Sequence, residues 1–179
     1  MALGAWKSFP TYTAWVGPDA VTPMAASDDY VIYYGATYVG YTVYSLAYIK
    51  TSDLSVSTVL AWRTGSGAIQ FGLAGVVWDA SANEFRCYGP GGEWFALAPT
   101  APTMTRYNTS PIPGASVVDV ATLGGFDYLL GATAIAVVDA STGLSTGSMT
   151  LPTGPWTRIH AHGGKIVVIG TTTEMLVIT

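Results

Sequence analysis

The sequence has little charge. Only 10% of its 179 residues are charged, and seven Lys and Arg stand against eleven Asp and Glu, which gives a formal net charge of −4. An ordinary soluble domain has roughly a quarter of its residues charged, so we expect part of this surface to be covered by other protein subunits. The acidic balance also lacks the basic footprint of a protein that binds nucleic-acid phosphates. We therefore expect protein partners and no nucleic acid.

Cysteine is almost absent, since Cys87 is the only one. A single thiol excludes an intrachain disulfide and any multi-thiolate zinc or iron–sulfur site, and we expect no cofactor. The N-terminal residues lack the basic and apolar regions of a signal peptide. Residues 31–49 carry no charge and are long enough for a membrane span, but their six tyrosines and two glycines favour two strands and a turn. No membrane span is expected.

Helical patterns are also lacking. No window of a dozen residues keeps apolar residues at i, i+3, i+4 and i+7 behind a capping residue, whereas strand patterns occur throughout. The Gly-Gly pairs at 124–125 and 163–164 each separate two such strands and lie 39 residues apart. Glycine reaches the positive φ angles that two-residue hairpins need. The sequence therefore predicts repeated antiparallel hairpins.

These hairpins recur as a four-stranded unit every 40 to 50 residues or so, the spacing of β-propeller blades. We predict one all-β domain over residues 1–179, a propeller of about four blades made of four-stranded antiparallel sheets. The expected blades are residues 20–62, 68–98, 115–154, and 156–179 together with 6–17. The N-terminal strand at 6–17 would complete the last blade and close the ring. The proline-rich segment 99–114 is expected to be a long connection between blades.

Two strand-turn segments carry a family resemblance. Residues 136–143 (AVVDASTG) and 76–82 (VVWDASA) place an aspartate directly after an apolar strand, and Asn83 stands where the second turn would have a glycine. The pattern resembles the blade turns of quinoprotein-like and related repeat propellers. That resemblance implies a propeller fold and brings no catalytic residues with it. The composition, rich in Gly, Thr, Ala and Tyr, is also similar to that of bacteriophage tail propeller modules.

Candidate metal ligands are few. His160 and His162 are two residues apart on a predicted strand, so they would face the same side, as two metal ligands do. Asp119 and Asp127 lie within or beside apolar strands, where they would line the central channel and bind a cation or serve as hydrogen-bonded structural carboxylates. Because a metal site normally needs three protein ligands and no third is identifiable near the histidines, we predict no metal.

Aromatic residues are the other candidate binding groups. Their large, rigid faces suit stacking on sugars, and the candidates are Trp78, Trp94, Tyr38, Tyr41 and Tyr107. Packing between blades explains the tryptophans at equivalent blade positions better than glycan binding does, and pattern alone does not separate buried from exposed aromatics. A lectin-like propeller that binds a cell-surface glycan is therefore the alternative function.

Signatures of catalysis are missing, since no serine lies in a G-x-S-x-G nucleophile elbow. We therefore predict that the chain is not an enzyme and has no catalytic residues. We expect a structural and interaction module that belongs to a larger assembly of protein subunits. The composition favours a bacteriophage virion or tail as that assembly, with the chain made in the host cytoplasm and located in the virion.

Overall fold

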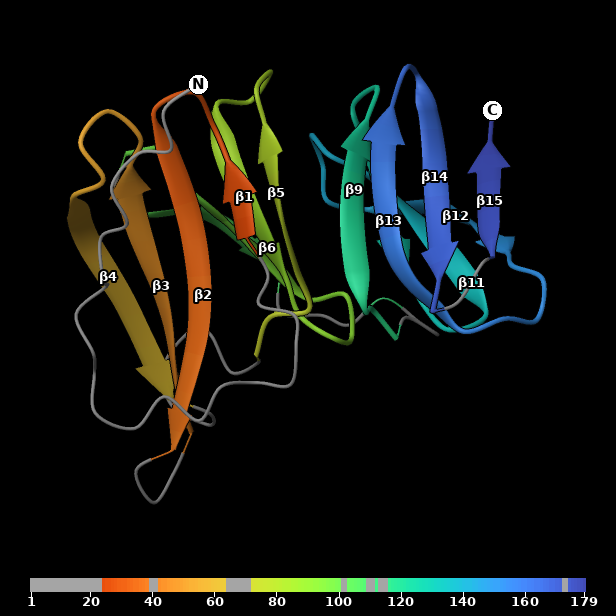
Figure 1. Cartoon of the computed structure of the whole chain (residues 1–179), viewed down its shortest axis with the longest axis horizontal. Coiled ribbons are helices and arrows are strands. Elements are labelled where there is room, and N and C mark those ends of the chain that lie inside the picture. Colours follow the sequence, from red (N-terminus) through yellow and green to blue (C-terminus); the bar gives the residue numbers. More distant parts are fainter. Residues whose placement is uncertain are drawn as a thin grey trace, which may run out of the picture.

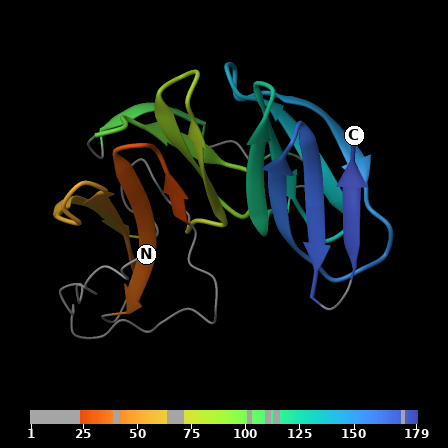
Figure 2. The same ribbon diagram turned by 45° about the horizontal axis from the view of Figure 1, so that its top comes forward.

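The computed structural model describes residues 24–38, 42–63, 72–100, 103–108, 112, 116–171 and 174–179. These residues form fifteen strands in four antiparallel sheets and no helix (Figures 1 and 2). In each sheet, strands that follow one another along the chain pair side by side. The all-β prediction is therefore confirmed.

The strands of each sheet are consecutive in the sequence. The first sheet contains β1 (Met24–Ala26), β2 (Tyr30–Tyr38), β3 (Thr42–Lys50) and β4 (Val56–Arg63). The second contains β5 (Gly75–Asp79), β6 (Glu84–Tyr88), β7 (Trp94–Leu97) and β8 (Met104–Asn108). The third contains β9 (Asp119–Leu123), β10 (Phe126–Leu130), β11 (Ala134–Asp139) and β12 (Ser145–Thr150). The fourth has three described strands, β13 (Trp156–His162), β14 (Lys165–Gly170) and β15 (Met175–Ile178).

The second sheet departs from the sequence prediction at both of its ends. Its outermost strand, β8, lies within the proline-rich segment 99–114, so the prediction of a mere connection there is wrong. Half-buried Met104 and Arg106 alternate with exposed Tyr107 in this strand. Prolines stand close to the strand on both sides, so the composition of the segment indicates a loop. At the other end, the blade is expected to begin at residue 68, but Gly72 and Leu73 are not in a strand and the first described strand begins at Gly75. Residues 68–71 lie outside the described residues.

The two Gly-Gly pairs form the predicted tight hairpins. Gly124 and Gly125 join β9 to β10 with φ angles of 62° and 81°. Gly163 and Gly164 join β13 to β14 with φ angles of 56° and 73°. Two successive positive φ angles are required by a type I′ turn, whose twist matches that of the flanking strands. The prediction of repeated hairpins is confirmed at these two positions.

The uncharged stretch 31–49 lies in β2 and β3. Val31 pairs with Ile49 across the two strands. The two predicted strands are therefore confirmed, and the turn between them lies outside the described residues. In the ranges that the structure describes, no helix is long and apolar enough to span a bilayer.

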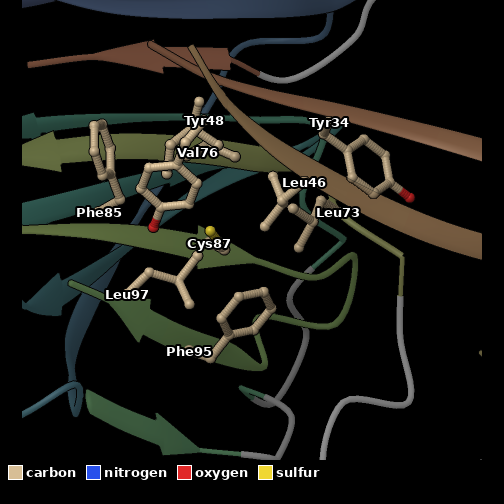
Figure 3. Close-up of a cluster of buried hydrophobic side chains, with 10 residues drawn as sticks. Tyr34, Leu46, Tyr48, Leu73, Val76, Phe85, Cys87, Phe95 and Leu97 are labelled. Carbon is tan, nitrogen blue, oxygen red and sulfur yellow. The ribbon is translucent and has the colours of Figure 1, made fainter. Parts of the chain in front are cut away.

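Neighbouring sheets pack face to face on apolar cores. The core between the first and second sheets, drawn in Figure 3, contains Ile32, Tyr34, Leu46, Tyr48, Leu73, Val76, Phe85, Cys87, Phe95 and Leu97. The core between the second and third sheets contains Val77, Tyr88, Trp94, Ala96, Val117, Val120, Leu129 and Val138. The core between the third and fourth sheets contains Ala121, Leu130, Ile135, Leu151, Trp156, Ile159, Ile166 and Val168. The second and third sheets are thus covered on both faces.

The four sheets are arranged in chain order as an open fan. Their innermost strands β1, β5, β9 and β13 run in the same direction, and each contacts the next. The first and fourth sheets stand at the two ends of the fan, with β4 on the left and β15 on the right (Figures 1 and 2). Residues 6–17, which the sequence predicts to complete the last blade and close the ring, lie outside the described residues.

Candidate functional site

Two charged side chains are buried between the second and third sheets. Arg86 on β6 and Asp127 on β10 are 1% and 0% exposed. Arg86 Nε donates to Asp127 Oδ2 at 2.5 Å, and Arg86 Nη2 donates to Asp127 Oδ1 at 2.8 Å. This bidentate geometry is the strong, charge-assisted form of an arginine–carboxylate pair. The pair links the two middle sheets of the fan.

Three neighbours complete this group. Arg86 Nη1 donates to Asp79 Oδ2 at 2.5 Å, and the Tyr88 hydroxyl donates to Asp127 Oδ2 at 2.6 Å. Thr122 Oγ1 accepts from Arg86 Nη2 at 3.4 Å. We call Arg86, Asp127, Asp79, Tyr88 and Thr122 the Arg86 cluster. It connects β5 and β6 of the second sheet to β9 and β10 of the third.

The cluster sets the protonation of its members. Burial works to lower the pKa of Arg86, but the hydrogen bonds and charge of Asp127, with help from Asp79, outweigh it and raise that pKa. Burial works to raise the pKa of Asp79, yet hydrogen bonds from Ser81 and Arg86 bring it down to about 2. Burial and the charge of Asp127 raise the pKa of Tyr88. At neutral pH Arg86 is therefore charged and Tyr88 is a neutral hydrogen-bond donor.

The geometry of the Arg86 cluster suits a structural role. All three guanidinium nitrogens of Arg86 have acceptors within the cluster, and both oxygens of Asp127 accept hydrogen bonds. Near-complete burial of Arg86 and Asp127 leaves no position for a substrate or an ion. A buried charge is costly unless it is paired. The cluster therefore fixes how the second and third sheets sit against each other.

A second bridge crosses the same interface. Arg106 on β8 pairs with Glu84 on β6 and donates to the carbonyl oxygens of Ala140 and Ser141, at 3.1 and 2.5 Å, in the turn after β11. Its guanidinium carbon lies 5.3 Å from the Trp94 ring centroid, within the range of a cation–π contact. Arg106 therefore attaches the edge of the second sheet to a turn of the third.

The aspartate turns that carry the family resemblance share one geometry. Asp79 Oδ1 accepts from the backbone N–H of Ser81 at 2.9 Å and from its hydroxyl at 2.6 Å. Asp139 Oδ1 accepts from Ser141 at the same two distances. The residue four positions after each aspartate has a positive φ, 52° at Asn83 and 70° at Gly143. Asparagine is among the few residues other than glycine that adopt this conformation readily, which explains Asn83.

The structure does not bring Asp119 and Asp127 together. They lie at opposite ends of the β9–β10 pair, Asp119 opposite Leu130 and Asp127 opposite Thr122. Asp119 Oδ2 accepts from the backbone N–H of Ile159 at 3.0 Å and so joins β9 to β13. Burial raises the pKa of Asp119. Each carboxylate thus bridges the third sheet to a different neighbour.

His160 and His162 lie on β13 and are exposed. Strand alternation places both on the same side of β13, as the sequence predicts. This side points away from the third sheet. Among the residues that the structure describes, no three His, Cys, Asp or Glu side chains are grouped as metal ligands would be.

The aromatic candidates occupy different environments. Trp78 is half-buried against Phe85, with ring centroids 4.7 Å apart, and belongs to the core with the first sheet. Trp94 is 4% exposed and faces the third sheet, whereas Tyr107 is 61% exposed on β8. The two tryptophans lie on opposite faces of the second sheet and form no common platform. The side chain of Tyr38 and all of Tyr41 lie outside the described residues.

One face of the fourth sheet is covered by no other described sheet. Ile159, Val168 and Leu176 pair across the sheet and point toward the third sheet. Their neighbours along each strand point the other way. We call this opposite side the outer face of the fourth sheet; it comprises Arg158, His160, His162, Lys165, Val167, Ile169, Met175 and Val177.

Sequence reasoning missed the Arg86 cluster, although a signal was present. Arg86 and Asp127 are each the one charged residue in an otherwise apolar stretch, at 85–88 and 126–130. A charge inside a buried strand needs a partner of opposite sign. The two strands are about forty residues apart, so only the stacking of sheets pairs them.

Solved structures provide the comparison for this fold. No protein-family model and no curated protein sequence matches the chain. The computationally designed Ika4 protein has a TM-score of 0.60 at 11% identity, covering 92% of this chain and 94% of that one. The WD40 domain of Toxoplasma gondii coronin has a TM-score of 0.60 at 9% identity, covering 87% of this chain and 41% of that one. BamB from Moraxella catarrhalis has a TM-score of 0.55 at 10% identity, covering 87% and 45%.

These similarities define the fold class. WD40 domains are β-propellers built from four-stranded blades around a central axis. The four stacked antiparallel sheets of this chain, with their innermost strands side by side, match that architecture. The chain therefore has a β-propeller-type fold. It spans less than half the length of the coronin domain and of the BamB chain.

Proposed function

We propose that this chain is a non-catalytic interaction module of a larger protein assembly and that it docks through the outer face of the fourth sheet. The observation that carries the proposal is the exposure of Met175 (67%), Val177 (43%) and Ile169 (36%) on that face. The other exposed large apolar side chains, Leu54, Tyr107, Val118 and Leu144, are spread over separate elements. Clustered exposed apolar side chains are typical of protein–protein contact surfaces.

Two further features support this proposal. Arg86 is the most deeply buried cation among the described residues, and it donates its hydrogen bonds to side chains of the Arg86 cluster. These contacts suit a structural role better than a catalytic one. The low overall charge also fits a surface that is partly covered by protein. Of the three aromatic candidates whose side chains the structure describes, Tyr107 is exposed, whereas Trp78 is half-buried and Trp94 is buried.

Oxidation of Met175 tests the proposed docking face. We expect Met175 to react readily with a brief pulse of hydroxyl radicals in the dilute, isolated chain, and to be protected in the assembly purified from the natural source. Half-buried Met149, which packs toward the third core, is the internal reference because its surroundings are the same in both states. Mass spectrometry of the peptides measures both residues. Equal reactivity of Met175 in the two samples would refute docking through this face.

For the assembly itself we propose a virion, with a bacteriophage tail as the kind of structure that the charge-poor, Gly-, Thr-, Ala- and Tyr-rich composition favours. Peptide mass spectrometry of purified particles would test this setting. Finding the chain only in free host-cell protein, and none in particles, would exclude it.

We also propose that each sheet is one blade, giving four blades per chain, and that the strand predicted over residues 6–17 completes the fourth. Support comes from the strand count, since three sheets have four strands and the fourth has three described ones, with β15 paired on one side by β14. Deletion of residues 1–17 is expected to speed hydrogen exchange in β15 and to leave β10 unchanged. Unaltered exchange in β15 would contradict this completion of the blade.

A further inference from the structure

We propose that the partner on the outer face of the fourth sheet is an acidic sheet of a different protein subunit, with its carboxylates over β13 and its apolar side chains over β14 and β15. This inference rests on the proposed function, because it names the chemistry of the partner of the same docking face. The division of that face into a basic part and an apolar part carries the proposal.

The outer face of the fourth sheet is divided between two kinds of side chain. Basic side chains occupy β13 and the start of β14, namely Arg158, His160, His162 and Lys165. Apolar side chains occupy β15 and the rest of β14, namely Val167, Ile169, Met175 and Val177. The register places Arg158 opposite Ile169 and His160 opposite Val167, and the apolar side chains of β15 continue these two rows. A partner therefore meets basic groups along one margin and apolar surface along the other.

The outer face is open to solvent. Six of its eight side chains are exposed, and Arg158 and Val167 are half-buried. Figures 1 and 2 show β13, β14 and β15 at one end of the fan, and no further described sheet covers them there. The basic and the apolar side chains are therefore both available to one partner.

The basic side chains of this face have no ion-pair partner within the described residues. Arg158 Nη1 donates to a backbone carbonyl oxygen at 2.7 Å, and neither Arg158 nor Lys165 belongs to any of the described ion pairs. Asp119 lies close enough to Arg158 and His160 for their charges to act on it. Both of its oxygens, however, accept from backbone N–H groups, one of them that of Ile159 at 3.0 Å. The carboxylates for this face must therefore come from elsewhere.

These basic groups determine which partner the face suits. A purely apolar partner would remove Arg158 and Lys165 from water without a group of opposite sign, which is costly. Two fourth sheets packed face to face would place the basic groups either on each other or on apolar side chains, and neither arrangement pairs them. Carboxylates over β13 compensate the basic groups while the rest of the partner covers the apolar margin. Charge complementarity therefore favours an acidic protein surface.

The strands of this chain offer no such acidic sheet. The carboxylates within the described strands are those of Asp79, Glu84, Asp119, Asp127 and Asp139. All five residues are buried or half-buried, and all five accept hydrogen bonds within the chain. None of the described strands thus presents a row of exposed carboxylates to a second copy. We therefore assign the acidic sheet to a different protein.

Carbodiimide cross-linking of the assembly purified from the natural source is the first test. The reagent activates a carboxylate, and a lysine amine in contact with that carboxylate then forms an amide with it. We expect Lys165 to be joined to an aspartate or glutamate of a different protein, which mass spectrometry of the peptides identifies. Lys50, exposed at the end of β3, is the internal reference and should give no such product. A Lys165 product with another copy of this chain would overturn the assignment.

Charge variants are the second test, measured as co-sedimentation of the purified chain with assembly prepared without it. Lys165→Glu and Arg158→Glu should each weaken binding by at least about tenfold, because each then places like charge against the carboxylates of the partner. Lys165→Arg should keep the affinity and lose the cross-link. Lys50→Glu is the matched control, with an expected change below about twofold. Circular dichroism confirms that the variants are folded, and equal binding of all four variants would overturn the acidic partner.

The outcomes separate this proposal from the docking proposal. Protection of Met175 in the natural assembly without a Lys165 cross-link would overturn the acidic partner and leave the docking face intact. Vesicles of phosphatidylcholine and phosphatidylglycerol in equal parts test an anionic membrane surface. Protection of Met175 on these vesicles, but not in the assembly, would assign the face to a membrane and overturn the acidic protein. Equal Met175 reactivity in all samples would remove both proposals.

Discussion

At the residue scale, the interior of this protein depends on a few polar contacts within apolar strands. Arg86 and Asp127 are the most fully buried charges, and each compensates the other. A buried ion pair adds little net stability compared with apolar residues of the same volume, but breaking it is costly. The main effect of the pair is therefore to determine how the second and third sheets pack against each other.

Removing one partner of this pair should destabilise the fold strongly. Asp127→Asn leaves the Arg86 guanidinium buried with only part of its charge balanced, so we expect a loss of about 3–5 kcal/mol in the free energy of unfolding. Urea denaturation followed by tryptophan fluorescence measures it. The double variant Arg86→Met with Asp127→Leu should recover most of the loss, because neither charge of the pair is then buried without the other. A double variant as unstable as Asp127→Asn would contradict this explanation.

A second prediction at this scale concerns Gly143. Its φ is 70°, and a Cβ atom there would overlap the Trp94 ring. Gly143→Ala should therefore cost more than the 1–2 kcal/mol or so of the left-handed conformation alone. Gly124→Ala is the matched control, since Gly124 has a φ of 62° but no atom within 4 Å of the new Cβ. Equal urea midpoints for the two variants would show that the contact with Trp94 has no effect.

At the scale of the element, the aspartate turns join strands and in one case also join sheets. Asp79 and Asp139 hold equivalent turns after β5 and β11. Only Asp79 also contacts Arg86. Hydrogen bonds from Ser81 and Arg86 lower the pKa of Asp79 against the opposing effect of burial, whereas at Asp139 the hydrogen bonds of Ser141 and Thr142 lower the pKa. The same turn thus has two different environments.

This difference predicts a pH dependence. The pKa of Asp79 is about 2 in the folded chain against 3.8 ordinarily, so its contribution of about 2 kcal/mol is present above pH 4 or so and is lost as the pH falls toward 2. Asp79→Asn should lower stability at pH 7 and flatten the stability profile between about pH 4 and 2. The contribution of half-buried Asp119 has the opposite sign, because its raised pKa adds stability at low pH that is lost as the pH rises.

Asp139→Asn provides the control for this experiment. Its turn can keep the hydrogen bonds through the amide oxygen, and no arginine pairs with it among the described contacts. We expect the pH profile of Asp139→Asn to resemble that of the unmodified chain in urea titrations at each pH. A profile as flat as that of Asp79→Asn would mean that the turn, and not the ion pair with Arg86, causes the pH dependence.

At the scale of the whole molecule, the sheets form a series in which each contacts its neighbours. The second and third sheets have cores on both faces, whereas the first and fourth have a described core on one face only. Stability is therefore expected to be uneven along the series, as it is in repeat architectures.

Hydrogen exchange should show this unevenness. We expect amides of β6 and β10 to exchange at least about tenfold more slowly than those of β15, which belongs to the fourth sheet at the end of the series. Mass spectrometry of peptides from the three strands measures the rates. Uniform rates would instead indicate that the four sheets open as one cooperative unit.

Much of the fold could be predicted from the sequence because hairpins are local. Gly124–Gly125 and Gly163–Gly164 set their turns through glycine's access to positive φ, and the strands on either side follow from alternation. The four-stranded repeat then indicated a propeller. The prediction failed at β8, where closely spaced prolines concealed a short strand.

The contacts between sheets were decided only by the tertiary structure. Arg86 and Asp127 are ordinary charged residues in the sequence, and their pairing exists because face-to-face stacking brings together strands that are distant along the chain. Likewise, alternation placed Met175 and Val177 on one face of a strand, but only the order of the sheets left that face uncovered. The sequence by itself determined strands and turns, since these depend on neighbouring residues. Burial, pairing and exposure depend on packing between distant segments, so the structure alone determined them.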